Sequence, residues 1–194
     1  DTRAFAATGR RLGARQPLVE ALIERNEQRK RALARRIIAQ ARLSRGARVA
    51  VLGLAFKAGT DDVRESAALS IIGVLQQAGM TVSAHDPRAG SNAAPLLRGV
   101  AMAASPYEAA QGADALVILT EWEEYRGLDF ARLAAAMRGR TVFDYRNILP
   151  AEAVARHGLT CIRLGRRPDL PEHHAPAGSQ TALAERSVAA PTRI

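Results

Sequence analysis

The sequence predicts an α/β fold in which a mostly parallel sheet lies between two layers of helices and a long helix precedes it. Short apolar runs alternate with helical segments from residue 47 to residue 164, which implies parallel strands joined by right-handed crossovers. Two of the runs, RVAVLGLAF and ADALVILT, are almost unbroken, as strands covered on both faces should be. We therefore predict a Rossmann-like three-layer sandwich with a long connecting helix.

Residues 1–45 are predicted to be a helical segment. A short helix over residues 2–13 ends at Gly13, and Pro17 suits the first turn of a second helix that continues to about Leu43. Leucine and isoleucine recur along one stripe of this second helix. Roughly 27 helical residues would make a rod about 40 Å long. Such a rod is longer than one small domain needs, so we expect it to connect domains or to pack against a second subunit.

Residues 46–165 are predicted to form one α/β domain. In chain order we expect strands at Val49–Ala55, Thr81–His85, Val100–Ala103, Ala115–Thr120, Thr141–Tyr145 and Leu159–Leu164. We expect helices at Ala67–Gln77, Pro106–Gln111, Phe130–Met137 and Ala151–Arg156, and a link containing Pro, Gly and Ser after the second strand. Sustained periodicity then stops, and residues 166–194, rich in Pro and Ala with mixed charge, are predicted to be a flexible tail.

The positive charge is concentrated at one end of the chain. The net charge is +9, but residues 1–48 carry 13 Arg or Lys against 4 Asp or Glu, whereas residues 49–164 carry 11 against 12. Aromatic residues, on which single-stranded nucleic acids stack, make up only 4% of the chain. We therefore predict no nucleic-acid partner. The alternative, an Arg-rich helix that grips nucleic acid, would show steeply salt-dependent binding to duplex DNA.

The sequence also indicates a compartment. One cysteine excludes an internal disulfide framework, no apolar run approaches the roughly 20 residues that span a bilayer, and the N-terminus lacks the apolar centre of a signal peptide. We expect a cytoplasmic protein without a membrane partner. Cys161 is expected to be buried rather than catalytic, and His173 and His174 have no third ligand nearby, so no metal site is predicted.

The stretch GLAFKAGTDDVRES, residues 53–66, joins the first strand of the α/β region to the helix that follows it. Ligands of open α/β sheets bind beyond the carboxyl ends of the strands. A dinucleotide-binding loop would need Gly at positions 53, 55 and 58, but this chain has Gly53 followed by alanine at the other two. Lys57 and Arg64 offer two cations that can reach phosphate or carboxylate. Either could also be an ordinary solvated side chain or pair with a neighbouring acid.

Two further charged residues follow predicted strands. Asp86 occupies the place of a ribose-binding acid in a dinucleotide site, although the missing glycines weaken that role. Arg146 follows the fifth strand, so we expect it at the same edge of the sheet as Lys57. The alternative for Arg146 is a surface ion pair with Asp144.

Four segments together resemble the C-terminal, nucleotide-sugar-binding part of the UDP-glucose/GDP-mannose dehydrogenase family. GLAFKAGTDDVRES resembles its pattern G-L-x-F-K-x-x-T-D-D-x-R-x-S/A, LTEWEEYRGLDFARL its T-E-W-x-x-F/Y segment, and VFDYRNILP its D-x-R-N element. DTRAFAATGRRLG followed by LVEALIERNEQRK resembles the entry into the family's long central helix. The resemblance covers about residues 1–165. The second and third segments favour the UDP-glucose branch, while GDP-mannose and N-acetylated UDP-sugars remain alternatives.

This resemblance implies an NAD-dependent, two-step oxidation of a nucleotide sugar's C6 alcohol to a carboxylate, UDP-glucose to UDP-glucuronate in the favoured branch. The second step would use a cysteine, because a hydride can leave an aldehyde only after a nucleophile has added to its carbonyl. That cysteine belongs to the family segment C-F-P-K-D, and Asp1 aligns with its last residue. We therefore expect the cysteine and the N-terminal NAD-binding domain to be missing from this chain, and the chain alone to be inactive.

The resemblance also assigns roles to residues. Phe56, Lys57 and Arg146 should bind the UDP-sugar, Arg64 should contact the NAD pyrophosphate across the domain cleft, and Asp1 should assist water and proton transfer beside the cysteine. The long helix should form a homodimer. A free-standing Rossmann-like NAD-binding module is the alternative, and tight NAD binding without UDP-sugar would favour it.

Overall fold

The computed structural model describes residues 2–165, which fold around a six-stranded sheet with the strand order β3-β2-β1-β4-β5-β6. All neighbouring strands are parallel. The strands are β1 (Arg48–Leu52), β2 (Thr81–His85), β3 (Ala101–Met102), β4 (Ala115–Ile118), β5 (Thr141–Asp144) and β6 (Thr160–Arg163). The predicted α/β fold with a parallel sheet is confirmed. From β1 the strand order runs outward to β2 and β3 on one side and to β4, β5 and β6 on the other, and ligands of doubly wound sheets bind beyond the carboxyl ends of the strands at the point where the order changes side.

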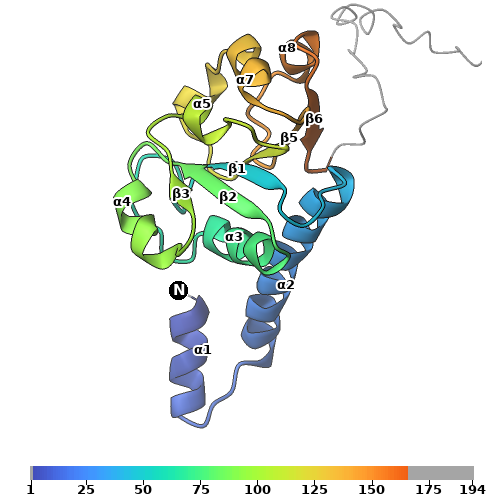
Figure 1. The fold of residues 1–194 in the computed structure, drawn as a ribbon. Coiled ribbons are helices and arrows are strands. Elements are labelled where there is room, and N and C mark those ends of the chain that lie inside the picture. The colour runs from blue at the N-terminus through green and yellow to red at the C-terminus, as the bar shows by residue number, and fades with distance from the viewer. Residues whose placement is uncertain (1, 166–194) are drawn as a thin grey trace, which may run out of the picture.

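Helices cover both faces of the sheet (Figure 1). One face is covered by α2 (Pro17–Gln40) and α3 (Ala67–Gln77), and the other by α5 (Pro106–Ala109), α7 (Phe130–Ala136) and α8 (Ala151–Arg156). Three short helical segments complete the unit: α4 (Gly90–Ala93), η1 (Ala94–Leu96) and α6 (Glu123–Arg126). The strands β1 and β4 are buried on both sides, apart from the first residue of β1, which explains their unbroken apolar sequences.

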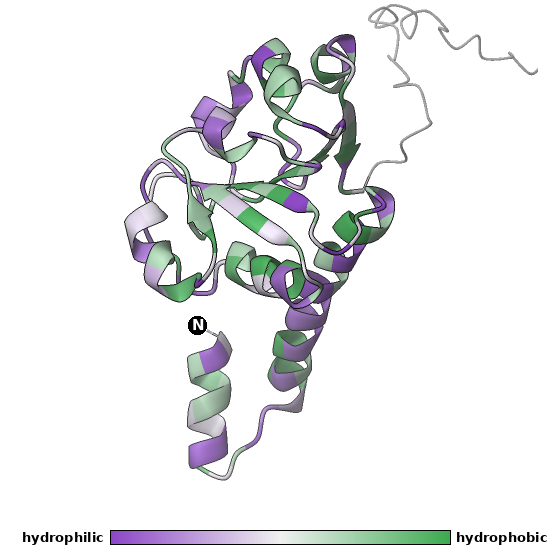
Figure 2. Ribbon diagram, viewed as in Figure 1, coloured by the Kyte–Doolittle hydropathy of each residue, from purple (hydrophilic) through white to green (hydrophobic). Residues whose placement is uncertain are grey.

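The two N-terminal helices are only partly attached to this unit. The 24 residues of α2 make a rod about 36 Å long. Ala34 and Ile37, in its C-terminal half, are fully buried in the core shared with α3. Its N-terminal half exposes Leu18 and Leu22, and lies beside α1 (Thr2–Arg11). Figure 2 shows apolar and polar residues mixed along both helices there.

Most element bounds agree with the sequence pattern, and one difference is informative. Three elements have the predicted bounds: Ala67–Gln77, Thr81–His85 and Ala151–Arg156. The first strand, however, ends at Leu52 rather than Ala55. The chain leaves the sheet there because the N–H groups of Leu54 and Ala55 donate to the side chain of Asp86 instead of to a neighbouring strand.

Candidate functional site

The turn after β1 is fixed by one buried carboxylate. Asp86 is the first residue after β2 and is almost inaccessible to solvent. It accepts five hydrogen bonds of 2.7–3.0 Å, from the backbone N–H groups of Leu54, Ala55, Arg88 and Ala89 and from Nε1 of Trp122. Burial alone would raise the pKa of Asp86, but these donors outweigh it and the pKa is lowered. Asp86 is therefore held as an anion inside the protein.

This arrangement replaces the ribose-binding role considered for Asp86. In a dinucleotide site the N–H groups of the first turn face the ligand's phosphates. Here the N–H groups of Leu54 and Ala55 are already bonded to Asp86. The backbone of Gly53 has φ +94° and lies so close to Thr120 that an added Cβ would be 2.5 Å from it. The turn is therefore closed toward β2.

The segment Thr120–Tyr125 braces the same turn. The Thr120 hydroxyl donates to the carbonyl oxygen of Ala55 at 2.7 Å. The Tyr125 hydroxyl donates to the carbonyl oxygen of His85 at 3.0 Å and lies 3.1 Å from the Nδ1 of the same residue. Burial lowers the pKa of His85 and raises that of Tyr125. In the segment TEWEEY, the side chains of Thr120, Trp122 and Tyr125 thus have a structural role.

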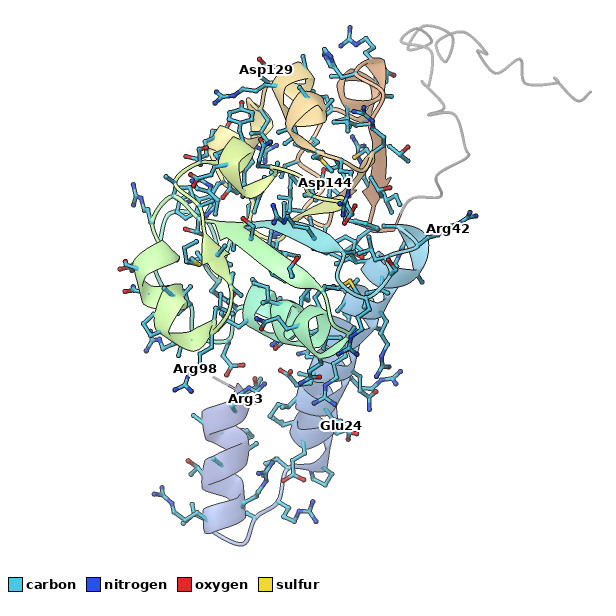
Figure 3. The ribbon with its side chains drawn as sticks, in the orientation of Figure 1. Arg3, Glu24, Arg42, Arg98, Asp129 and Asp144 are labelled. Atoms are coloured by element: carbon cyan, nitrogen blue, oxygen red, sulfur yellow. The ribbon has the colours of Figure 1, made fainter. Side chains whose placement is uncertain are left out.

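A cavity of about 650 Å³ opens on the other side of the turn. It lies between α1, α2 and the carboxyl edge of the sheet. In Figure 3, Arg3 marks the α1 side, and Asp144 marks the end of β5. Its lining includes Asn26 and Lys30 of α2, Phe56 and Glu65 of the turn, Leu119 after β4, and Tyr145 and Arg146 after β5. Asn26 and Lys30 interrupt the apolar stripe of α2, and their place in this lining explains why polar residues stand there.

The charged side chain of Arg146 forms part of the wall of this cavity. Its Nε donates to Oε2 of Glu121 at 2.5 Å, and its Nη2 contacts the same oxygen. Its backbone N–H donates to Oδ1 of Asp144 at 3.2 Å. The guanidinium therefore pairs with Glu121, not with Asp144. Sequence reasoning missed Glu121, although an acid three residues after the end of β4, at the same edge of the sheet, was a usable signal.

Ion pairs also hold the N-terminal helices to the cavity. Arg3 of α1 donates to Glu27 of α2 at 2.5 Å and to Glu65 of the turn at 2.6 Å. Lys30 donates to Glu27 at 2.9 Å, and this bond is the main reason that the pKa of Glu27 is lowered. The cavity wall therefore joins α1, α2 and the turn through charged groups, all of them outside the apolar core.

The structure brings some of the predicted site residues together and leaves others apart. Phe56, with 54% of its surface exposed, lines the cavity with Arg146. Lys57 is exposed on the same turn but is not part of the lining. Arg64 has an 87% exposed side chain that bonds to Asp62 at 2.8 Å, which lowers the pKa of Asp62 to about 2. Asp1 lies outside the described residues.

Other classes of site are weakly supported. Within residues 2–165 no three His, Cys, Asp or Glu side chains are grouped so that they could hold a metal ion. His173 and His174 lie outside the described residues. Cys161 is partly buried in β6, and burial raises the pKa of its thiol, which disfavours the reactive thiolate. None of the described helices combines the length and the apolar character that crossing a membrane requires.

Comparison with known proteins relates the chain to one protein family. Residues 50–151 match the model of the UDP-glucose/GDP-mannose dehydrogenase family, UDP binding domain. Among curated proteins, the chain is 45% identical over 170 residues to a UDP-glucose 6-dehydrogenase of Rhizobium meliloti, and 37% identical over 174 residues to one of Pseudomonas aeruginosa. These matches cover 87% and 86% of the chain but only 39% and 38% of the two relatives. The chain thus spans less than half the length of the curated relatives it matches.

Solved structures of nucleotide-sugar dehydrogenases are also similar to this chain. The chain is similar to a UDP-glucose dehydrogenase from Pyrobaculum islandicum, with a TM-score of 0.66, 32% identity, and coverage of 84% of this chain and 35% of that one. It is also similar to a UDP-D-ManNAc dehydrogenase from Pyrococcus horikoshii, with a TM-score of 0.58, 27% identity, and coverage of 77% and 33%. Both the turn after β1 and the Arg146 segment lie within the matched family region.

Proposed function

Because the chain belongs to the UDP-glucose/GDP-mannose dehydrogenase family, we propose that it is the UDP-sugar-binding part of a UDP-glucose 6-dehydrogenase. The observation that carries this proposal is the cavity of about 650 Å³ at the carboxyl edge of the sheet, where Phe56 of one family motif and Arg146 of another line the same wall. The full-length protein would oxidise the C6 alcohol of UDP-glucose to the carboxylate of UDP-glucuronate. This chain would bind the nucleotide part of the substrate.

Each proposed binding residue suits a part of that ligand. The exposed Phe56 ring offers an apolar face against which a base or sugar can pack. The Arg146 guanidinium has five N–H donors, more than its bonds to Glu121 use, and can bond ribose or phosphate oxygens. Lys57, exposed next to Phe56, has a flexible stem that can reach a phosphate from outside the cavity.

NAD would be held elsewhere in the full-length enzyme. The turn after β1 does not fit a dinucleotide of its own, because the N–H groups of Leu54 and Ala55 already donate to Asp86. This observation weighs against a free-standing NAD-binding module. Arg64 has an exposed guanidinium, and we propose that it contacts the pyrophosphate of NAD bound by another domain. NAD there would accept the hydride from C6. Asp1 keeps its proposed role beside the catalytic cysteine.

Titration of the chain with UDP and UDP-glucose tests the binding proposal. Binding should raise the melting temperature, and Arg146→Ala should weaken it about tenfold or more, the effect of losing a charge-assisted hydrogen bond. Lys57→Ala should have a smaller effect. Arg132→Ala is the control, because Arg132 stacks on Tyr107 and does not line the cavity.

The outcomes separate the alternatives. No response to millimolar UDP would contradict the proposal, and tighter binding of NAD alone than of UDP would favour the free-standing module. Stronger responses to GDP-mannose or to N-acetylated UDP-sugars would move the chain to another branch of the family. Retention on duplex DNA that weakens with salt would support the nucleic-acid alternative.

We also propose a homodimer that uses the long helix. Four large apolar side chains are exposed on α1, the link after it and the first half of α2: Phe5, Leu12, Leu18 and Leu22. Such grouping is typical of an interface. Light scattering should give about twice the chain mass, and Leu18→Glu should favour the monomer. A monomeric wild-type chain at micromolar concentration would contradict this assembly for the chain by itself. The cytoplasmic location and the boundary at residue 45 stay predictions.

A further inference from the structure

Glu121 differs from its neighbours in the segment after β4. The side chains of Thr120, Trp122 and Tyr125 bond to groups inside the protein, in the turn after β1 and around the end of β2. The Glu121 side chain is partly exposed and its carboxylate bonds to Arg146, which lines the cavity. Glu121 therefore joins this structural segment to the ligand-binding wall.

The same carboxylate acts on both loops of the proposed site. On one side it bonds to Nε and Nη2 of Arg146, in the loop after β5. Toward the other loop, the backbone N–H of Ala58, two residues after Phe56, interacts electrostatically with the same side chain and has the smallest of the effects that lower its pKa. Burial pushes the pKa of Glu121 upward, but these donors and its own backbone N–H outweigh it, so the pKa is lowered. Glu121 is thus an anion at neutral pH.

These contacts orient Arg146 without using all its donors. A free arginine side chain has about 2 kcal/mol of rotamer entropy, part of which is lost when it is held in one orientation. Glu121 bonds to Nε and Nη2, which lie on one edge of the planar group. The donors on the other edge, around Nη1, remain for a ligand in the cavity. The cost of ordering Arg146 is then met before the ligand arrives.

We propose that Glu121 is a positioning residue, which holds Arg146 in the orientation that receives the nucleotide. This inference rests on the proposed function, because it concerns the affinity of the same cavity. The opposite effect is also physically reasonable: a carboxylate near a diphosphate repels it and competes for Arg146. If positioning dominates, removing the Glu121 carboxylate weakens UDP binding. If repulsion dominates, removing it strengthens UDP binding.

The experiment measures UDP affinity by calorimetry for the wild-type chain and for substitutions at position 121. Glu121→Ala should weaken binding about tenfold. Glu121→Gln should lose much less, because its amide oxygen still accepts a bond from Arg146. Glu123→Ala is the matched control. Glu123 is also an acid paired with an arginine, Arg126 at 3.0 Å, but it is 88% exposed and, unlike Arg146, its arginine partner is not in the cavity lining.

A double-mutant cycle separates positioning from general structural damage. If Glu121 acts through Arg146, adding Glu121→Ala to Arg146→Ala should change the affinity less than twofold further. Full additivity would overturn the inference. Unchanged or tighter binding by Glu121→Ala would also overturn it, while leaving the proposed function intact if Arg146→Ala alone still weakens binding. A wild-type chain that does not bind UDP would remove both.

Discussion

The carboxyl edge of the sheet has a closed side and an open side. Toward β2, the buried Asp86 accepts five hydrogen bonds and leaves no N–H group of Leu54 or Ala55 for a ligand. Toward β5, Arg146 and Phe56 face a cavity of about 650 Å³. Both sides share the topology of a dinucleotide-binding sheet. The comparison teaches that strand order locates the edge at which ligands bind, while individual polar side chains decide which part of it stays open.

The largest expected effect is on the closed side, at Gly53. An alanine there would place its Cβ 2.5 Å from Thr120 and would have to adopt φ near +94°. We expect Gly53→Ala to destabilise the protein by about 3 kcal/mol or more. Gly59→Ala is the control, because Gly59 also has a positive φ, +82°, but open space around its Cβ position. It should cost about 1 kcal/mol. Equal losses in urea denaturation would show that the contact with Thr120 is unimportant.

The next effect concerns the internal anion. Asp86→Asn should cost about 2 kcal/mol at pH 7. The carboxylate accepts the five bonds with two oxygens, whereas the asparagine side chain has one acceptor oxygen and an NH₂ group that can only donate. The pKa of Asp86 is lowered from its ordinary value of 3.8. Its contribution is therefore complete above about pH 4 and is lost as the pH falls through the lowered pKa.

Denaturation from pH 7 to pH 2 checks this assignment. The gap in stability between wild type and Asp86→Asn should shrink as the pH falls below 3.8. Asp61→Asn, at an exposed acid of the same turn, should change stability by less than about 0.5 kcal/mol. A gap that stays constant down to pH 2 would mean that the charge of Asp86 is not what stabilises the turn.

The smallest effect on stability is expected on the open side. Phe56 is 54% exposed, so Phe56→Ala should change the free energy of unfolding by less than about 0.5 kcal/mol. UDP affinity should nevertheless fall several-fold, because a face for the nucleotide is lost. Leu96→Ala is the control, since Leu96 is 61% exposed on η1 and is not in the cavity lining. If both variants bind UDP like the wild type, Phe56 is not part of the site.

Sequence patterns predicted the sheet well because buried strands and their connecting helices have strong local signals. The helix Ala67–Gln77 and the strand Thr81–His85 have the expected bounds. The first strand was predicted three residues too long, because its apolar run continues while the acceptor of its last N–H groups, Asp86, lies more than 30 residues away. The short helices α4 and α6 have too few residues to show a period.

The candidate site was predictable in part for a different reason. Topology placed Arg146 and the turn after β1 at one edge, and the cavity contains Phe56 and Arg146. The roles of Asp86 and Glu121 could not be read from spacing, because each depends on donors from distant segments. The distinction between Phe56 in the cavity wall and Lys57 outside it depends on side-chain direction, which a sequence does not specify.

The carboxylate of Asp86 sets a condition for redesigning this protein. Placing glycine at positions 55 and 58 would recreate the consensus of a dinucleotide loop, yet the backbone N–H groups of residues 54 and 55 would still donate to the carboxylate of Asp86 and not to a phosphate. A designer would have to remove the Asp86 carboxylate first. New acceptors would then be needed for Nε1 of Trp122 and for the four backbone N–H groups that now donate to Asp86. Building a dinucleotide site here thus means rebuilding this hydrogen-bond network, since new loop residues alone leave the acid in place.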